Sequence, residues 1–527
     1  MKLLIAAAAA AAAMALTMAP LPARAAPGLP STNVAWLPAA ADADIERAFA
    51  QARAEKKPVL LYWGATWCPP CNQLKATLFN RQDFAELSRS FVAVHVDGDR
   101  PGAQKLGRRF KVSGYPTVVL LGGDGAEITR LPGEADVEQV MGVLQLGLSG
   151  GRPAKAVLAD ALAGKPLVAN EWRLLAFYSW DTDDQQLLPR AEVPGTLARL
   201  ATASAAAQAG DSETTTRLWL KALAASDDGQ GLKPDAALRA RVQRLLADPA
   251  QSRAQMDGLT NGAADIVKAL EPEGSPGRAA LVAAFETTLQ RLQADTTLSR
   301  GNRLDALISR IQLARLDTPK DAVQVKLPEP LLKDVREHIA RADREITDGY
   351  ERQAVITAAG YALGLAGLWA ESDALLQANL AKSHSPYYLM SQLGSNARKL
   401  GRTAEALRWH GQAFDKSEGP ATRLQWGSSY LAALVDLAPK DAARIEKLAA
   451  QLLAEAARDE GAFEGRSVRS LQRVSSKLVG WGGDGKQAAV MQRLQTQLAG
   501  VCAKVDMAEG QRAACQGLLK TTAKKAG

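Results

Sequence analysis

Cysteine and histidine are scarce in this chain of 527 residues, which contains four of each. So few cysteines exclude a small fold that is held together mainly by disulfides. Aromatic residues make up only 5% of the sequence, and no basic run is interleaved with them. Nucleic-acid binding is therefore not expected, and the diffuse formal charge of +8 is better explained by solubility.

Long apolar runs are also lacking, except for one at the N-terminus. Residues 1–25 have the features of an export signal, because Lys2 supplies positive charge, 3–16 are apolar, and Ala23-Arg24-Ala25 fits a cleavage site. The alternative is a membrane anchor. The prolines from Pro20 onward interrupt the run before it reaches the roughly 20 apolar residues that cross a bilayer. We therefore expect a cleaved signal peptide.

The pattern of residues changes at about residue 150. Between Val59 and Val140, β-rich runs alternate with helical periodicity, which predicts a small mixed sheet with helices on both faces. Glycines and a proline at 147–153 mark a linker, after which helical periodicity dominates. We expect a signal peptide over 1–25, an α/β domain over 26–148, and helical regions over 149–255 and 256–527.

Part of the last helical region repeats after 34 residues. The recurring residues are Gly360, Gly367, Glu371, Lys382, Ser383 and Pro386, followed by Gly394, Gly401, Glu405, Lys416, Ser417 and Pro420. This spacing resembles the tetratricopeptide repeat, a helix–turn–helix unit. The resemblance implies an all-α, solenoid-like region that could hold a protein partner. An irregular helical bundle is the alternative.

Two of the cysteines lie in the segment Trp67-Cys68-Pro69-Pro70-Cys71, between a buried strand and a helix. Unpaired N–H groups and the helix dipole lower the pKa of a thiol at a helix N-terminus, so Cys68 is the expected nucleophile. Cys71 lies one turn further in, where it can attack a mixed disulfide and release the product. Pro69 and Pro70 stiffen the first turn, which tolerates a missing N–H.

This segment, with the strand before it and the helix after it, resembles the W-C-x-x-C active site of the thioredoxin superfamily. The resemblance covers Pro58 to about Leu146. Gly114-Tyr115-Pro116-Thr117 is similar to the cis-proline loop of that family. The resemblance implies that Pro116 is cis, that the backbone of Tyr115 can pair with an extended substrate, and that Gly133 lines the groove.

One position departs from the pattern of the family. The family commonly has a buried carboxylate six residues before the first cysteine, where it helps to move the proton of the resolving thiol. Here that residue is Tyr62, which is a poor base at neutral pH. Water or a substrate group is then expected to take this role. His95 is expected to be an ordinary strand residue, and the basic residues of 100–111 a solvated helix face.

The residues between the cysteines bear on the direction of the reaction. Two prolines offer neither the charge nor the donor that histidine provides in strongly oxidising members of the family. We therefore expect a periplasmic reductase or isomerase that acts on disulfides of exported proteins without a cofactor. The resemblance also implies re-reduction by a membrane thiol electron-transfer partner.

Two other function classes are alternatives. One is a helical-repeat scaffold or chaperone whose α/β domain only docks partners. The other is a copper or zinc site formed by the thiolates of Cys68 and Cys71. No nearby histidine or third cysteine completes such a site, so no metal is expected.

The remaining cysteines, Cys502 and Cys515, are expected to form a structural disulfide. In one continuous helix their Cα atoms would lie about 20 Å apart. A disulfide tolerates at most about 7 Å. Turn residues at 506–510 would allow the chain to fold back, so that 492–504 and 511–520 form antiparallel helices. Two unlinked thiols on one long helix are the alternative.

Overall fold

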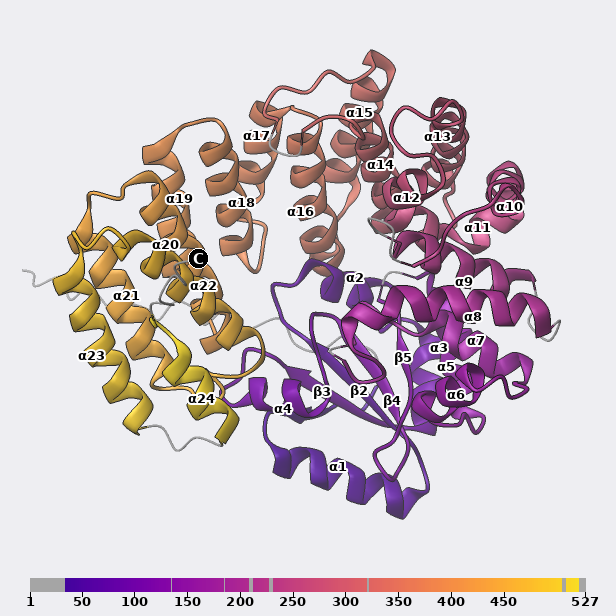
Figure 1. Ribbon diagram of the computed structural model, residues 1–527, viewed down its shortest axis with the longest axis horizontal. Helices are drawn as coiled ribbons and strands as arrows, with labels where there is room; N and C mark the ends of the chain where they lie inside the picture. The colour runs from indigo at the N-terminus through magenta and orange to yellow at the C-terminus, as the bar shows by residue number, and fades with distance from the viewer. Residues whose placement is uncertain are drawn as a thin grey trace, which may run out of the picture.

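The computed structural model describes residues 34–133, 135–183, 185–207, 212–226, 231–319, 322–504 and 509–520. An N-terminal α/β domain is followed by helices that bend back over it in an arch (Figure 1). The predicted signal peptide over 1–25 lies outside the described residues, as does most of the predicted turn at 506–510. No helix in the described ranges has the length and hydropathy needed to cross a bilayer.

The α/β domain is built on one mixed sheet with the strand order β1-β3-β2-β4-β5. The strands are β1 (Leu37–Ala39), β2 (Val59–Gly64), β3 (Val92–Asp97), β4 (Thr117–Leu121) and β5 (Glu127–Leu131). β3 runs parallel to β1 and β2, whereas β4 is antiparallel to β2 and β5. Every residue of β2 and β4 is buried, as is typical of central strands covered on both faces.

Helices cover both faces of this sheet, as the sequence predicts. They are α1 (Asp42–Glu55), α2 (Pro69–Thr77), α3 (Gln82–Leu87), α4 (Ala103–Arg109) and α5 (Val137–Leu148). Along β2, Leu60 and Tyr62 pack in the core cluster on one face, whereas Leu61 and Trp63 pack in the cluster on the other. This alternation follows from the two-residue period of a strand. The prediction of an α/β domain is confirmed.

The chain after α5 is helical, which confirms the prediction of a large all-α region. Within the described residues it forms α6 (Ala154–Leu162), α7 (Ala169–Phe177), α8 (Val193–Ala207), α9 (Ser212–Ala224), α10 (Ala236–Ala247), α11 (Pro249–Ala254), α12 (Met256–Leu270), α13 (Arg278–Ala294), α14 (Arg300–Ala314), α15 (Glu329–Glu345), α16 (Gly349–Leu365), α17 (Trp369–Asn379), α18 (Pro386–Lys399), α19 (Thr403–Lys416), α20 (Pro420–Leu437), α21 (Ala442–Ala456), α22 (Gly465–Gly482), α23 (Ala488–Lys504) and α24 (Glu509–Gly517).

The two copies of the 34-residue sequence repeat correspond to the helix pairs α16–α17 and α18–α19. Gly367 and Gly401 lie in the turns between the helices of each pair, with φ values of 78° and 71°. This left-handed backbone conformation favours glycine, because it carries no Cβ. The repeated glycines therefore have the same structural role in both copies.

A second pair of repeated glycines permits close packing between the helices. A Cβ at Gly360 would lie 2.6 Å from Cδ2 of Leu376, and one at Gly394 would lie 2.9 Å from the His410 ring. Leu376 and His410 are themselves one repeat apart in the sequence. The two helix pairs thus pack in the same way.

The two ends of the arch both contact the α/β domain (Figure 1). At one end, Arg253 forms an ion pair with Asp136, which directly precedes α5, over 3.2 Å. At the other end, the backbone N–H of Gly102 donates to Asp459 Oδ1 over 2.9 Å, just before α22 begins. The middle of the arch packs onto the domain where α16 contacts α2. The helical region therefore contacts the α/β domain at several places along the arch, whereas α1 lies on the side away from it (Figure 1).

The basic residues of 100–111 are exposed or half-buried, and two of them form ion pairs with the helical region. Lys105 pairs with Glu460 over 2.8 Å, and Arg108 pairs with Glu464 over 3.0 Å. Both carboxylates belong to the helical region. Positive charge on α4 therefore faces an acidic segment of the same chain, a long-range contact that local sequence patterns do not reveal.

The structure joins Cys502 and Cys515 in a disulfide between α23 and α24, with Cα atoms 5.9 Å apart. Cys515 is buried in the core cluster at the end of the arch. α23 ends at Lys504, and α24, which begins at Glu509, packs against it. At this distance the two cysteines cannot lie on one continuous helix, so that alternative is wrong.

Candidate active site

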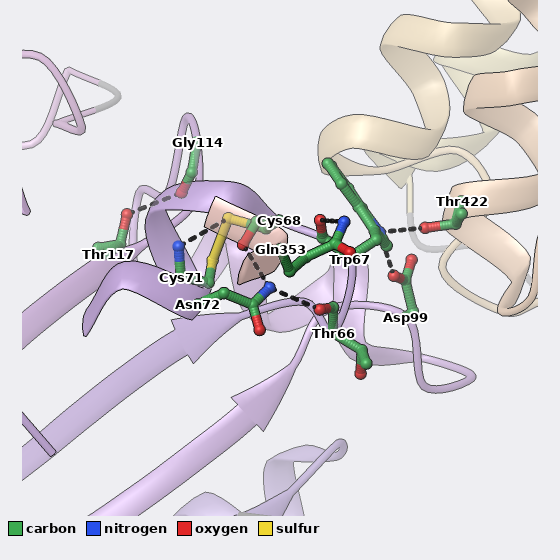
Figure 2. Close-up of a disulfide and its surroundings, with 10 residues drawn as sticks. All are labelled: Thr66, Trp67, Cys68, Cys71, Asn72, Asp99, Gly114, Thr117, Gln353 and Thr422. Carbon is green, nitrogen blue, oxygen red and sulfur yellow. Dashed lines mark hydrogen bonds between the residues drawn. A yellow bond between two sulfur atoms is a disulfide. The ribbon is translucent and has the colours of Figure 1, made fainter. Parts of the chain in front are cut away.

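Cys68 and Cys71 form a disulfide at the N-terminus of α2, with Cα atoms 5.2 Å apart (Figure 2). Cys68 is the N-cap residue, and the backbone N–H of Cys71 donates to its Sγ over 3.2 Å. Pro69 and Pro70 are the first helical residues, where no intrahelical donor is lost. A negative charge on the Cys68 sulfur would therefore meet the positive end of the helix.

Asn72 fixes the conformation of the loop around the cysteines. Its Nδ2 donates to the carbonyl oxygens of Thr66 and Cys68, both over 2.8 Å (Figure 2). The side chain is fully buried, which makes these hydrogen bonds costly to remove. Sequence reasoning missed Asn72, although an amide directly after the second cysteine was an available signal.

The predicted cis-proline loop lies beside the disulfide. The Tyr115–Pro116 peptide bond is cis, and Thr117 Oγ1 donates to the Gly114 carbonyl oxygen over 2.8 Å (Figure 2). Gly133 lies against this loop, because a Cβ there would be 3.0 Å from Pro116 Cγ. A cavity of about 390 Å³ brings together the predicted residues Pro70, Tyr115, Pro116 and Gly133.

The Tyr115 side chain is held inside the protein. Gln104 Nε2 donates to the Tyr115 hydroxyl over 2.8 Å and to the Gly98 carbonyl oxygen over 2.6 Å. A Cβ at Gly98 would lie 2.1 Å from the Tyr115 hydroxyl oxygen, so only glycine fits there. Burial raises the pKa of Tyr115, so the hydroxyl stays neutral.

Trp67 contacts the helical region directly. Its Nε1 donates to Asp99 Oδ2 over 2.8 Å and to Thr422 Oγ1 over 2.7 Å (Figure 2). Gln353 of α16 donates to the Trp67 carbonyl oxygen over 3.4 Å. The indole also stacks on Tyr388 of α18, with ring centroids 5.6 Å apart. The residue before Cys68 is thus held by three different helices of the arch.

Arg466 of α22 strengthens this contact. Its guanidinium lies 4.9 Å from the ring centroid of Trp67 and 5.0 Å from that of Tyr115. Nη2 donates to Asp99 Oδ1 over 2.6 Å and to Thr422 Oγ1 over 3.0 Å. Sequence reasoning missed Arg466, because nothing in the local sequence connects α22 with the cysteines.

The cysteines are enclosed by these contacts. Cys68 is 2% exposed and Cys71 is fully buried. They share an apolar cluster with residues of the helical region, namely Leu376, Tyr387, Leu389, Met390, Leu393, Trp409, Ala413 and Trp426. A cavity of about 230 Å³ is lined by Cys68. Another of about 620 Å³ is lined by Pro69 and Pro70. Access to the disulfide therefore passes beside the helical region.

Comparison with known proteins identifies the fold of this domain. A family model described as a thioredoxin-like domain matches residues 45–147. These residues form a thioredoxin-like domain. Together with the Cys68 and Cys71 pair, the match supports thiol–disulfide exchange as the chemistry of the site.

Curated relatives resemble only part of the chain. Thiol:disulfide interchange protein DsbD 2 of Pseudomonas aeruginosa is 30% identical over 110 residues, which are 20% of this chain and 19% of that protein. DsbD of Pseudomonas fluorescens is 32% identical over 98 residues, 18% of this chain and 17% of that protein. A thioredoxin of Mycolicibacterium smegmatis is 34% identical over 77 residues, 15% of this chain and 66% of that protein. The chain thus spans less than a fifth of the length of these DsbD relatives.

Tyr62, which stands where the family commonly has a buried carboxylate, lies in the core of the thioredoxin-like domain. Burial raises the pKa of Tyr62, and its hydroxyl has no hydrogen-bond partner in the described structure. The ring stacks on His95 of β3, with centroids 4.9 Å apart. Burial lowers the pKa of His95 to about 3. Neither side chain is therefore charged at neutral pH.

Two other titratable side chains lie in this part of the domain. Lys75, four residues after Cys71, shares its face of α2 and is 4% exposed. Burial lowers the pKa of Lys75 and raises that of Asp97 at the end of β3. Sequence reasoning missed both, although the spacing between Cys71 and Lys75 was an available signal. A buried lysine side chain is thus placed one helical turn from Cys71.

Proposed function

We propose that this protein is a periplasmic thiol–disulfide oxidoreductase that reduces or isomerises disulfides of exported proteins. Cys68 is the attacking thiol and Cys71 is the resolving thiol. The observation that carries the proposal is the disulfide between them at the N-terminus of α2, beside the cis-proline loop. Export would depend on the signal peptide over 1–25.

The reaction begins with the reduced protein. The Cys68 thiolate attacks one sulfur of the substrate disulfide, forms a mixed disulfide, and displaces the other substrate sulfur as a thiolate that takes up a proton. Cys71 then loses its proton and attacks Cys68 Sγ. This step restores the Cys68–Cys71 disulfide and releases the second substrate thiol. Two electrons pass from the protein to the substrate.

A dithiol donor must then return two electrons to the Cys68–Cys71 disulfide. We propose a membrane thiol electron-transfer protein for this role, because the relatives of the thioredoxin-like domain include thiol:disulfide interchange proteins. Substrate binding would use the backbone of Tyr115, which lines the same cavity as Pro70 and Gly133. No cofactor is required by this reaction.

The helical region is proposed to be a tetratricopeptide-like solenoid. The equivalent positions of Gly367 and Gly401 support this interpretation. We also propose that the chain is divided into a thioredoxin-like domain over 26–148 and helical regions over 149–255 and 256–527. A protein partner could then bind the outer surface of the arch.

The reduction potential of the Cys68–Cys71 pair tests the proposed direction. A value near that of thioredoxin, about −270 mV, is expected for a reductase. A value near −120 mV would indicate an oxidase instead. The protein is equilibrated with redox buffers and alkylated, and the Cys68 peptide is then analysed by mass spectrometry. Because this peptide is measured by itself, the redox state of Cys502 and Cys515 does not contribute to the potential.

A scaffold or chaperone is the second candidate, favoured by the burial of Cys68 under the helical region. In that case the Cys68→Ala/Cys71→Ala double variant should complement a deletion strain as well as the wild-type protein does. The oxidoreductase proposal expects the double variant to fail, although it is present at the same level in the cell.

A further inference from the structure

A cavity of about 920 Å³ lies between α20 and α22, near the C-terminal end of the arch (Figure 1). We call it the α22 groove. Its volume is in the range of pockets that bind ligands. It is lined on one side by Ser428, Ala432 and Asp436 of α20, and on the other side by Arg469, Arg473 and Lys477 of α22.

The α22 groove leads to the active site at Arg469. This side chain also lines the cavity of about 230 Å³ that is lined by Cys68. Arg469 Nη2 donates to the carbonyl oxygen of Ser113 over 3.0 Å, two residues before Tyr115 of the cis-proline loop. A chain segment that follows the groove past Arg469 would therefore reach the Cys68 sulfur.

The charged side chains of the groove are not all paired with one another. Asp436 forms ion pairs with Lys477 over 2.8 Å and with Arg398 over 2.7 Å. The negative charge of this carboxylate is thus shared by two cations. It does not balance the charges of Arg469 and Arg473, which are the other two charged residues that line the groove within the described chain.

Arg469 and Arg473 donate their hydrogen bonds to uncharged oxygens. The acceptor of Arg469 is a backbone carbonyl, and those of Arg473 are the hydroxyls of Ser470, over 3.1 Å, and Ser428, over 3.4 Å. Partial burial and the neighbouring charges of Arg469 and Arg466 lower the pKa of Arg473. A carboxylate bound in the groove would relieve this repulsion, so charge complementarity favours an acidic occupant.

The spacing of the two arginines indicates the conformation of this occupant. Arg469 and Arg473 are four residues apart on α22, so they lie on one face of the helix with a rise of about 6 Å between them. In an extended chain, side chains two residues apart point the same way and are separated by about 6.6 Å. Two such acidic side chains can therefore meet both arginines at once.

We infer that the α22 groove binds the substrate as an extended acidic segment, in which carboxylates two residues apart pair with Arg469 and Arg473 and hold the substrate disulfide near Cys68. The groove would then select substrates by charge before the chemical step. The inference rests on the proposed oxidoreductase function, because the bound segment is the one whose disulfide Cys68 attacks.

The test uses two peptides of equal length, each with one cysteine in a mixed disulfide with a chromogenic aryl thiol. After the cysteine, serine alternates with glutamate in one peptide and with lysine in the other. The full chain is reduced beforehand. Cys68 Sγ bonds to the peptide sulfur, the bond between the two substrate sulfurs breaks, and the aryl thiolate leaves and is followed by absorbance.

Two further measurements complete the assay. A small aryl disulfide without a peptide serves as the reference substrate, and its rate also shows that each variant is folded and reactive. The rates of the Cys68→Ser/Cys71→Ser double variant are subtracted to remove reaction at Cys502 and Cys515. The result is expressed as the ratio of the two peptide rates, which cancels any general effect of a variant on Cys68.

The wild-type protein should react faster with the glutamate peptide, by roughly fivefold in second-order rate constant. Arg473→Gln should lower this ratio, and Arg473→Glu should reverse it in favour of the lysine peptide. Arg344→Glu makes the same change of charge on an exposed arginine of α15, outside the groove, and should leave the ratio as it is.

Equal rates with the two peptides would overturn the inference. A ratio that Arg473→Glu does not change would also overturn it, as would a ratio that Arg344→Glu changes by the same amount. The oxidoreductase proposal stands in each of these cases if the reference disulfide still reacts. If the wild-type protein released no aryl thiol from the reference disulfide, the proposed function itself would fail, and the inference with it.

Discussion

The guanidinium of Arg466 lies 4.9 Å from the ring centroid of Trp67, the residue that precedes Cys68. The two residues come from opposite ends of the described chain. Asp99 receives hydrogen bonds from both, through different carboxylate oxygens. This contact fastens α22 to the active-site loop and so helps to enclose Cys68.

Replacing Arg466 should expose the cysteine. Arg466→Leu removes the cation–π contacts, worth about 0.5–2 kcal/mol each, and the ion pair with Asp99. We expect Cys68 in the reduced protein to be alkylated several times faster, measured by mass spectrometry of its peptide. Arg493→Leu, which breaks an exposed ion pair with Glu446, is the control and should not change this rate. Equal alkylation of Cys68 in wild type and Arg466→Leu would show that α22 does not limit access.

The roles of the two cysteines can be separated by trapping. Cys71→Ser removes the only thiol that can resolve the mixed disulfide, so substrates should accumulate as complexes linked to Cys68. Nonreducing gels and mass spectrometry of the purified complexes detect them. Cys68→Ser should trap nothing, and complexes in that variant would mean that the roles are reversed.

Lys75 is expected to assist Cys71 in place of the missing carboxylate. The protonated form of Lys75, one turn away, favours the Cys71 thiolate, so Lys75→Met should move the pH profile of the resolving step upward by about one unit. Single-turnover rates of mixed-disulfide resolution between pH 6 and 10 give this profile. Lys155→Met, on an exposed face of α6, should leave it unchanged. An unshifted profile for Lys75→Met would exclude Lys75 from this step.

Acid should destabilise the protein because its histidines are buried in the neutral form. Burial lowers the pKa of His95 to about 3 and that of His338, His384 and His410 to about 4, from 6.5. The unfolded chain therefore binds more protons than the native state once the pH falls below about 6.5. The free energy of unfolding should decrease from there to about pH 4.

Urea denaturation at several pH values measures this dependence. His410→Gln removes one of the titrating groups, so the slope of the unfolding free energy against pH should flatten by up to one proton. If wild type and His410→Gln had the same slope, the pKa of His410 would not be lowered in the native state.

The Cys502–Cys515 disulfide should stabilise the end of the arch. In the chain-entropy model, closing a loop of this length is worth roughly 3 kcal/mol. Cys502→Ser/Cys515→Ser should therefore lower the free energy of unfolding by up to that amount and speed proteolysis within α24. Mass spectrometry of a nonreduced digest should show the two peptides linked. Free, alkylated thiols at both positions would contradict the disulfide.

Local sequence signals predicted the parts of the molecule that depend on neighbouring residues. The segment from Trp67 to Cys71 predicted a helix that begins at a cysteine, and the strand before it identified the fold. The 34-residue repeat that includes Gly367 and Gly401 predicted helix–turn–helix units, and in the structure both glycines lie in turns where the backbone conformation favours glycine. Each of these features is decided within a few residues of the chain.

Long-range packing could not be predicted in the same way. Arg466 and Thr422 contact Trp67 because the helical region curves back towards the active-site loop. No short sequence pattern predicts this curvature. The ion pair between Lys105 and Glu460 has the same origin, because it joins two side chains at the surface that are far apart in the sequence.

The closed arrangement of the arch also limits the size of what can reach Cys68. The adjoining cavities measure about 230 and 620 Å³. A folded domain of 100 residues has a radius of gyration of about 13 Å, which is far too large to enter either of them. With the arch closed, only a segment that is already unfolded, or that unfolds locally, could present its disulfide. Under the proposed function, the helices would restrict the reaction to disulfides in segments that are unfolded or that unfold locally.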